Sequence, residues 1–262
     1  MFVPMLRRAC LSTLTASVTV AAMTALLFMN ANTAYAALAS SPACQGTLYL
    51  TFDTGNMRHA ELIAETLKKH QVKATFFVAN EKTWQGGMSL DATWANYWQA
   101  RVNEGHAFGS HTWRHGSFRE DVGDKVRYRL MDGKVEVLDA AAICQELRHA
   151  DQRFQELTGR KLNALWRAPG GRTTPNTLHA ATACGYQHMG WAAAGFLGDE
   201  LPSDSYPNQA LVQRALANLK DGDIVMAHLG IWSRKDPFAP MFDGLISGLK
   251  AKGFCFATLP KP

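Results

Sequence analysis

The sequence GTLYLTFDTG at residues 46–55 decides the fold. Thr47–Phe52 is a short run of β-branched, aromatic and leucine side chains, which is typical of a buried strand, and polar and turn-forming residues follow it from Asp53. Further along the chain, similar short apolar runs alternate with longer helical patterns. Such alternation is typical of parallel strands joined by helical crossovers, so we expect an α/β protein whose first strand ends at Asp53.

Seven strands and six helices are predicted after Gly46. The strands are expected at Thr47–Phe52, Lys73–Val78, His106–Gly109, Ala164–Trp166, Gln187–Gly190, Ile224–Ala227 and Phe254–Thr258. The helices are expected at Ala60–His70, Trp94–Asn103, Leu138–Leu157, Pro175–Cys184, Asn208–Leu219 and Pro240–Lys252. Two stretches, 82–90 and 115–134, match neither pattern and are expected to be loops. Seven strands favour a small or incomplete (β/α) barrel, formed by one domain over residues 46–262, rather than an open doubly wound sheet.

The first 36 residues have the pattern of a signal peptide. Arg7 and Arg8 precede an apolar stretch, Ala9–Met29, and Ala34-Tyr35-Ala36 supplies small residues at the positions that a signal peptidase reads. We expect cleavage after Ala36, which leaves residues 37–45 as a short segment before the domain. The alternative is an uncleaved anchor, because the apolar stretch approaches the length of a membrane span. Both alternatives predict an exported domain that is periplasmic or secreted.

The composition excludes several classes of protein. Of 262 residues, 47% are hydrophobic and 19% are charged, which is ordinary for a globular chain and argues against disorder or a coiled coil. Loss of Arg7 and Arg8 with the leader lowers the formal charge from +5 to +3. Because the remaining basic residues form no stripe, we expect no nucleic-acid partner. The sequence also implies no stable protein partner.

Four cysteines remain after the predicted cleavage: Cys44, Cys144, Cys184 and Cys255. An exported chain enters an oxidising compartment, so disulfides are allowed and three complete pairings are possible. Cys44 precedes the first predicted strand and Cys255 lies in the last one. Those strands are neighbours in a closed barrel, which favours the pair Cys44–Cys255. The alternative is that the cysteines are buried free thiols.

Polar residues with catalytic potential follow several predicted strands. Asp53 follows the first strand, His111 and His115 follow the third, Arg167 follows the fourth and His228 follows the sixth. Because barrel enzymes build their sites from the carboxyl ends of the strands and the loops beyond them, we expect these side chains to converge on one rim. The four-residue spacing of the two histidines also suits two ligands of one metal ion.

These residues carry a resemblance to a known family. Thr51-Phe52-Asp53, Ser110-His111-Thr112-x-x-His115, Arg167-x-Pro169-Gly170 and the strand 224–228 occur in family order. Together they resemble the polysaccharide deacetylase domain of carbohydrate esterase family 4, and the resemblance spans residues 46–259. It implies a distorted (β/α) barrel that holds one divalent metal ion, most often zinc.

The resemblance also implies a role for each residue of the site. His111 and His115 correspond to metal ligands, Asp53 to the general base, Arg167 to the group that orients the base, and His228 to the general acid. The chemistry suits these residue types, because a metal polarises the acetamide carbonyl while a carboxylate and an imidazole move the protons.

Five further positions are candidates for supporting roles. Gly170 stands where the family usually has an aromatic residue, and its backbone N–H is the expected oxyanion donor. Asp199 corresponds to the carboxylate that supports the acid histidine. The tryptophans Trp113, Trp191 and Trp232 are candidates for a sugar platform, with packing in the core or at the rim as the alternative for each.

Thr54 is the main departure from the family pattern. The family usually has a second aspartate here, which is the third metal ligand, whereas threonine is neutral and a weak ligand. Three alternatives remain open from the sequence. Another carboxylate replaces it, with Asp121, Asp124 and Asp199 as candidates in rim segments; or the metal is held weakly; or the metal is absent.

The sequence therefore predicts an exported metal-dependent hydrolase that removes N-acetyl groups from a cell-envelope or extracellular polysaccharide or oligosaccharide. O-acetyl esters are a close variant, because the same chemistry attacks both bonds. The rival hypothesis is a non-catalytic glycan-binding protein on a decayed deacetylase fold, which Thr54 favours.

Overall fold

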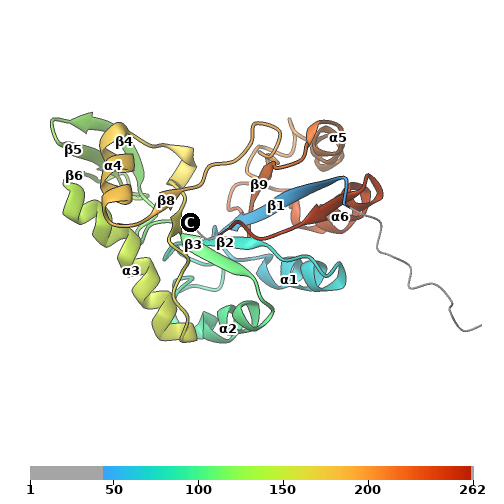
Figure 1. Ribbon diagram of the computed structural model, residues 1–262, viewed down its shortest axis with the longest axis horizontal. Coiled ribbons are helices and arrows are strands. Elements are labelled where there is room, and N and C mark those ends of the chain that lie inside the picture. The colour runs from blue at the N-terminus through green and yellow to red at the C-terminus, as the bar shows by residue number, and fades with distance from the viewer. Residues whose placement is uncertain (1–43, 261–262) are drawn as a thin grey trace, which may run out of the picture. The chain divides into compact units, whose positions relative to one another are not determined.

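The computed structural model describes residues 44–260 (Figure 1). The predicted signal peptide lies outside the described residues. The described strands are β1 (Gly46–Asp53), β2 (Thr75–Val78), β3 (Ala107–Ser110), β4 (Ser117–Val122), β5 (Lys125–Arg129), β6 (Val135–Leu138), β7 (Leu165–Trp166), β8 (Gln187–His188), β9 (Ile224–His228) and β10 (Phe254–Phe256). The α-helices are α1 (Ala60–Lys69), α2 (Ala95–Asn103), α3 (Ala140–Thr158), α4 (Pro175–Ala183), α5 (Asn208–Asn218) and α6 (Phe242–Ala251). No helix in this part of the chain has both the length and the apolar character needed to cross a membrane.

Seven of these strands form one parallel sheet. The hydrogen-bonded order is β10-β1-β2-β3-β7-β8, and β9 pairs with β1. An isolated parallel bridge from Phe196 to Met226 connects the segment after β8 with β9. The number and direction of the strands agree with the predicted distorted (β/α) barrel, and all seven predicted strands are present with small shifts at their ends.

Local signals in the sequence account for where helices begin and end. The Asp139 side chain accepts a hydrogen bond from the Ala142 N–H at the start of α3, and Gly159 ends that helix in the left-handed region with φ 72°. Thr174 caps α4 in the same manner. Figure 1 shows α1, α5 and α6 beside the β1 and β9 end of the sheet, with α3 and α4 beside β4–β6.

The main core is a cluster of aromatic side chains between the sheet and its helices. Phe52, Phe76 and Phe108 come from the adjacent strands β1, β2 and β3, and successive rings lie 5.7 Å apart between centroids. Phe154 of α3 packs on Phe108 with 4.7 Å between ring centroids. All of these side chains are fully buried. Because such a core is close-packed, it fixes the positions of the strand ends that carry the polar residues.

The expectation that residues 115–134 form a loop is wrong. These residues contain β4 and β5, which form an antiparallel sheet with β6. Phe118, Val126 and Tyr128 are buried beneath this sheet, whereas most of its other residues are exposed and charged. Lys125–Arg129 alternates charged and apolar residues, as a strand with one buried face does, but it lacks the continuous apolar run by which the other strands were predicted. Residues 82–90 form the expected loop, closed by a bridge between Lys82 and Met88.

Two disulfides join distant parts of the chain. Cys44 pairs with Cys255, as predicted, and their Cα atoms are 5.6 Å apart. Cys144 of α3 pairs with Cys184 at the end of α4. The first bond connects the beginning of β1 to β10, so it holds the two ends of the domain side by side.

Candidate active site

Four polar side chains come together because the parallel strands end at one edge of the sheet. Asp53 ends β1 and pairs in register with His228 at the end of β9. His111 directly follows β3, and Arg167 directly follows β7, the strand that pairs with β3. This edge is where open and closed α/β sheets bind ligands, and it is the rim that the sequence predicted.

A fully buried arginine holds Asp53 in place. The guanidinium of Arg167 donates to Asp53 Oδ1 at 2.9 Å and to the Thr51 hydroxyl at 2.8 Å. It also donates to the carbonyl oxygens of Met189 and Gly190, so all three nitrogens of the guanidinium donate hydrogen bonds. Burial acts to raise the pKa of Asp53, but nearby cationic groups, Arg167 foremost, hold that pKa below its usual value. The carboxylate is therefore ionised and oriented.

The two histidines direct ring nitrogens at each other. His111 Nδ1–H donates to the carbonyl oxygen of Arg167 at 2.9 Å, which leaves Nε2 with its lone pair. That atom lies 3.2 Å from His115 Nε2 and 3.5 Å from Asp53 Oδ2. Burial lowers the pKa of His111 to about 4. His111 is thus a neutral imidazole of fixed tautomer, which is the form that binds a metal ion.

A carboxylate that the sequence did not indicate lies beside this pair. Glu81 Oε2 accepts the Thr54 hydroxyl at 2.5 Å and the Gly55 N–H at 2.9 Å. Its other oxygen, Oε1, lies 3.5 Å from His115 Nδ1, a buried nitrogen without a hydrogen-bond partner. Burial acts to raise the pKa of Glu81, but the two histidines and the Thr54 hydrogen bond lower it overall.

The carboxylates named from the sequence lie elsewhere. Asp121 and Asp124 belong to the β4–β5 hairpin, where Asp121 accepts a hydrogen bond from the Asn176 N–H. Asp199 contacts His228. Glu81 stands three residues beyond the end of β2, so the strand-end rule that identified Asp53 also applied to it, although no motif pointed there.

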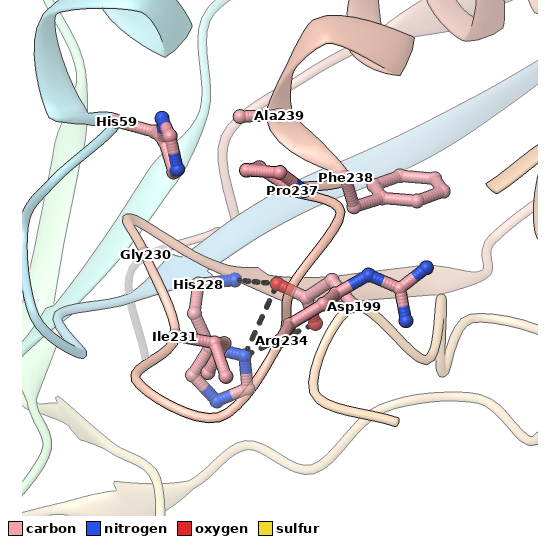
Figure 2. A pocket seen from close by; sticks show the side chains of 9 residues that line it. All are labelled: His59, Asp199, His228, Gly230, Ile231, Arg234, Pro237, Phe238 and Ala239. Atoms are coloured by element: carbon pink, nitrogen blue, oxygen red, sulfur yellow. Dashed lines mark hydrogen bonds and ion pairs between the residues drawn. The ribbon is translucent and has the colours of Figure 1, made fainter. Parts of the chain in front are cut away.

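Asp199 supports His228 through two contacts, drawn in Figure 2. Its Oδ2 accepts the His228 backbone N–H at 2.7 Å, and its Oδ1 lies 3.1 Å from His228 Nδ1. The carboxylate of Glu200 lies 3.5 Å from His228 Nε2. Burial alone would lower the pKa of His228, but the charge and hydrogen bond of Asp199 raise it to about 9. His228 is therefore a protonated imidazolium at neutral pH.

Gly170, in the loop after β7, and Trp191, beyond β8, lie near the same edge. Gly170 lies in the short 3-10 helix Pro169–Gly171 with φ 62°, a backbone region that favours glycine. A Cβ atom on Gly171 would lie 2.7 Å from the Trp191 ring, so the glycine allows that ring to approach the loop. The same ring lies beside the Arg167 guanidinium, 5.5 Å from its centroid.

The other two tryptophans differ in environment. Trp113 is partly buried and stacks on His149, with 3.9 Å between ring centroids, while packing against the main core. This agrees with the packing alternative for Trp113. Trp232 is 63% exposed, so its indole has a free face toward solvent.

The two histidines fit a divalent metal ion, but no third ligand in the described part of the chain is already in place beside them. His111 presents a lone pair, and His115 keeps a buried ring nitrogen without a partner. Among residues 44–260, however, no three His, Cys, Asp or Glu side chains are already arranged to hold an ion. The Thr54 hydroxyl donates to Glu81. Because threonine is neutral, position 54 supplies no anionic ligand to a metal ion.

Comparison with known proteins identifies the family. A family model described as polysaccharide deacetylase matches residues 40–189, more than half of the chain. A peptidoglycan-N-acetylglucosamine deacetylase of Bacillus cereus is 26% identical over 86% of this chain and 71% of its own length. A chitooligosaccharide deacetylase of Azorhizobium caulinodans is 23% identical over 82% of this chain and 94% of its own.

The fold is also that of solved structures in this group. A pseudoenzyme of carbohydrate esterase family 4 from Bacillus anthracis superposes with a TM-score of 0.59 at 19% identity, covering 82% of this chain and 64% of that one. The matched family range contains Asp53, Glu81, His111, His115 and Arg167. On the strength of that match, the chain belongs to the polysaccharide deacetylase family.

Proposed function

We propose that this protein is an exported, metal-dependent hydrolase that removes N-acetyl groups from a cell-envelope or extracellular polysaccharide. The observation that carries the proposal is that one site holds a proton acceptor, a proton donor and two histidines that suit a metal ion. Asp53 is an ionised carboxylate held by Arg167, and His228 is an imidazolium held by Asp199. His111 directs the lone pair of Nε2 into the same site, 3.5 Å from Asp53 Oδ2.

Each of these groups has a step to perform in amide hydrolysis. Asp53 accepts the proton of the attacking water, because it is ionised and fixed by Arg167. His228 donates its proton to the departing amine nitrogen, and Asp199 keeps it charged until that step. The backbone N–H of Gly170 stabilises the developing oxyanion. A divalent metal, most often zinc in this family, held by His111 and His115, would supply Lewis-acid polarisation of the acetamide carbonyl.

The substrate class follows from family membership. The two relatives are named for peptidoglycan N-acetylglucosamine and for chitooligosaccharides, and both substrates carry N-acetyl groups on glucosamine. The predicted signal peptide at residues 1–36 and two disulfides fit an enzyme that meets such polymers outside the cytoplasm.

The test is acetate release from peptidoglycan and chitooligosaccharides by the purified domain with added zinc or cobalt. We expect release that falls at least ~100-fold in Asp53→Asn and in His228→Gln, because each variant removes a proton carrier. His179→Gln, which alters an exposed histidine of α4, is the matched control and should retain activity. Tight glycan binding without acetate release under every metal condition would support the rival, a glycan-binding protein, and would refute the hydrolase.

A further inference from the structure

The carboxylate of Glu81 lies directly beside the side chain of Thr54. The Thr54 hydroxyl and the Gly55 N–H both donate to the same oxygen, Oε2, at 2.5 and 2.9 Å. The Glu81 backbone is fixed as well, because its N–H donates to the Ser89 hydroxyl at 2.9 Å. The Glu81 side chain, which comes from the loop after β2, is thus held against the end of β1 by two hydrogen bonds, one of them from Thr54.

The second oxygen of Glu81 remains available to the histidine pair. Oε1 lies 3.5 Å from His115 Nδ1, which is too long for a hydrogen bond, and that nitrogen has no other partner among residues 44–260. Two donors bound tetrahedrally to one zinc ion at 2.0–2.2 Å lie ~3.3–3.6 Å apart. The histidine Nε2 atoms lie 3.2 Å apart, close to such an edge, and Glu81 Oε1 lies 3.5 Å from the other ring nitrogen of His115.

Of the carboxylates Asp53, Glu81 and Asp199, Glu81 is the one without a role in the proposed proton transfers. Asp53 is held through Oδ1 by Arg167 and is the proposed base, although its Oδ2 lies 3.5 Å from His111 Nε2. Asp199 supports His228. The Glu81 side chain is 13% exposed and is paired with no lysine or arginine among the described ion pairs. Two imidazoles plus one carboxylate form a three-ligand set of the kind found in catalytic zinc sites.

We propose that Glu81 is the third ligand of the metal site and replaces the carboxylate that position 54 lacks. Because Glu81 now faces Nδ1 of His115 while His111 faces Nε2, the ring of His115 or the carboxylate turns when the ion binds. This inference rests on the metal dependence in the proposed function, but it is tested by binding rather than by turnover.

The experiment measures zinc and cobalt binding to the metal-depleted protein by calorimetry, together with the visible absorption of the cobalt form. Four proteins form a double-mutant cycle: the natural chain, Glu81→Gln, Thr54→Asp and the double variant. Glu65→Gln removes one exposed charge from α1 and is the matched control. Circular dichroism without metal checks that every variant folds.

We expect Glu81→Gln to weaken zinc binding more than ~100-fold, beyond the 10–100-fold loss typical of a residue that only supports a ligand. Its cobalt spectrum should change in intensity. Thr54→Asp should change affinity little by itself and restore it in the Glu81→Gln background, because both carboxylates fill one coordination position.

Two results would overturn the inference. One is unchanged zinc affinity in Glu81→Gln. The other is an equal gain from Thr54→Asp in both backgrounds, which would show that Glu81 acts only through His115. Glu81-dependent metal binding without acetate release would instead refute the proposed hydrolase and leave the ligand assignment standing.

Discussion

Asp199 sets the protonation of His228, so Asp199→Asn should move the alkaline limit of activity. The natural carboxylate accepts the His228 backbone N–H at 2.7 Å and lies 3.1 Å from Nδ1. Asparagine keeps the first contact through its carbonyl oxygen. It then turns its NH₂ group toward Nδ1, where it favours the neutral ring. The variant thus loses the charge and reverses one hydrogen bond without changing the size of the side chain.

The magnitude follows from the pKa. With Asp199 in place the pKa of His228 is about 9, so ~90% of the imidazole is protonated at pH 8. Without Asp199, burial opposes the charge and we expect a pKa at or below ~6.5, which leaves ~3% protonated at pH 8. For a general acid the rate should fall about 30-fold at pH 8 and about fourfold at pH 7.

The assay is kcat/KM for acetate release between pH 6 and 10, with the His228 ring titrated by NMR on the same protein. Asp204→Asn alters an exposed carboxylate five residues away and serves as the control. Stability gives a second check. Because the folded pKa of about 9 lies above the unfolded value of 6.5, protonated His228 stabilises the fold fully below pH 6.5. That contribution is lost as the pH rises toward 9. An alkaline limb that stays at the same pH in Asp199→Asn, although the ring titrates lower, would refute His228 as the acid.

Three other variants test the scaffold and the base. Arg167→Met leaves the Asp53 carboxylate buried and uncompensated, so we expect about 3–5 kcal/mol loss of unfolding free energy and little activity in denaturant titrations and acetate assays. Substitution of Cys144 and Cys184 by alanine opens a loop with a sequence separation of 40 and should cost about 4 kcal/mol, measured against the oxidised parent; an unchanged midpoint would mean that the bond adds nothing. Phe108→Ala creates a cavity in the aromatic core and should cost about 3–5 kcal/mol, whereas a loss below 1 kcal/mol would show that the core is looser than its contacts indicate.

Residues whose signal is local were predictable from the sequence. The strands of the parallel sheet appear as apolar runs because both of their faces are buried, and Asp53, His111, Arg167 and His228 stand directly after such runs. The strand-end rule therefore placed them on one edge before any distance was known. The pairing of the first and last strands likewise indicated one disulfide.

Other features lacked the signals from which the parallel strands were predicted. Strands β4 and β5 bury one face only, so Lys125–Arg129 alternates charged and apolar residues and contains no continuous apolar run. Glu81 lies beyond Ala79 and Asn80, so it is separated from its strand and has no motif of its own. Its place beside Thr54 arises from tertiary packing between the ends of two strands, which is information that spacing along the chain does not contain.

The position of β1 has a consequence for the order in which the molecule folds. β1 is the first strand of the domain, yet it is hydrogen-bonded to β9 and β10, which lie more than 170 residues later in the chain. An emerging chain therefore holds an apolar strand with unsatisfied backbone groups until nearly all of the domain has followed it. Contacts this distant in sequence slow folding and prolong the exposure of a surface prone to aggregation. A truncation that removes β9 and β10 would thus leave β1 paired with β2 alone and would remove His228 from its place opposite Asp53.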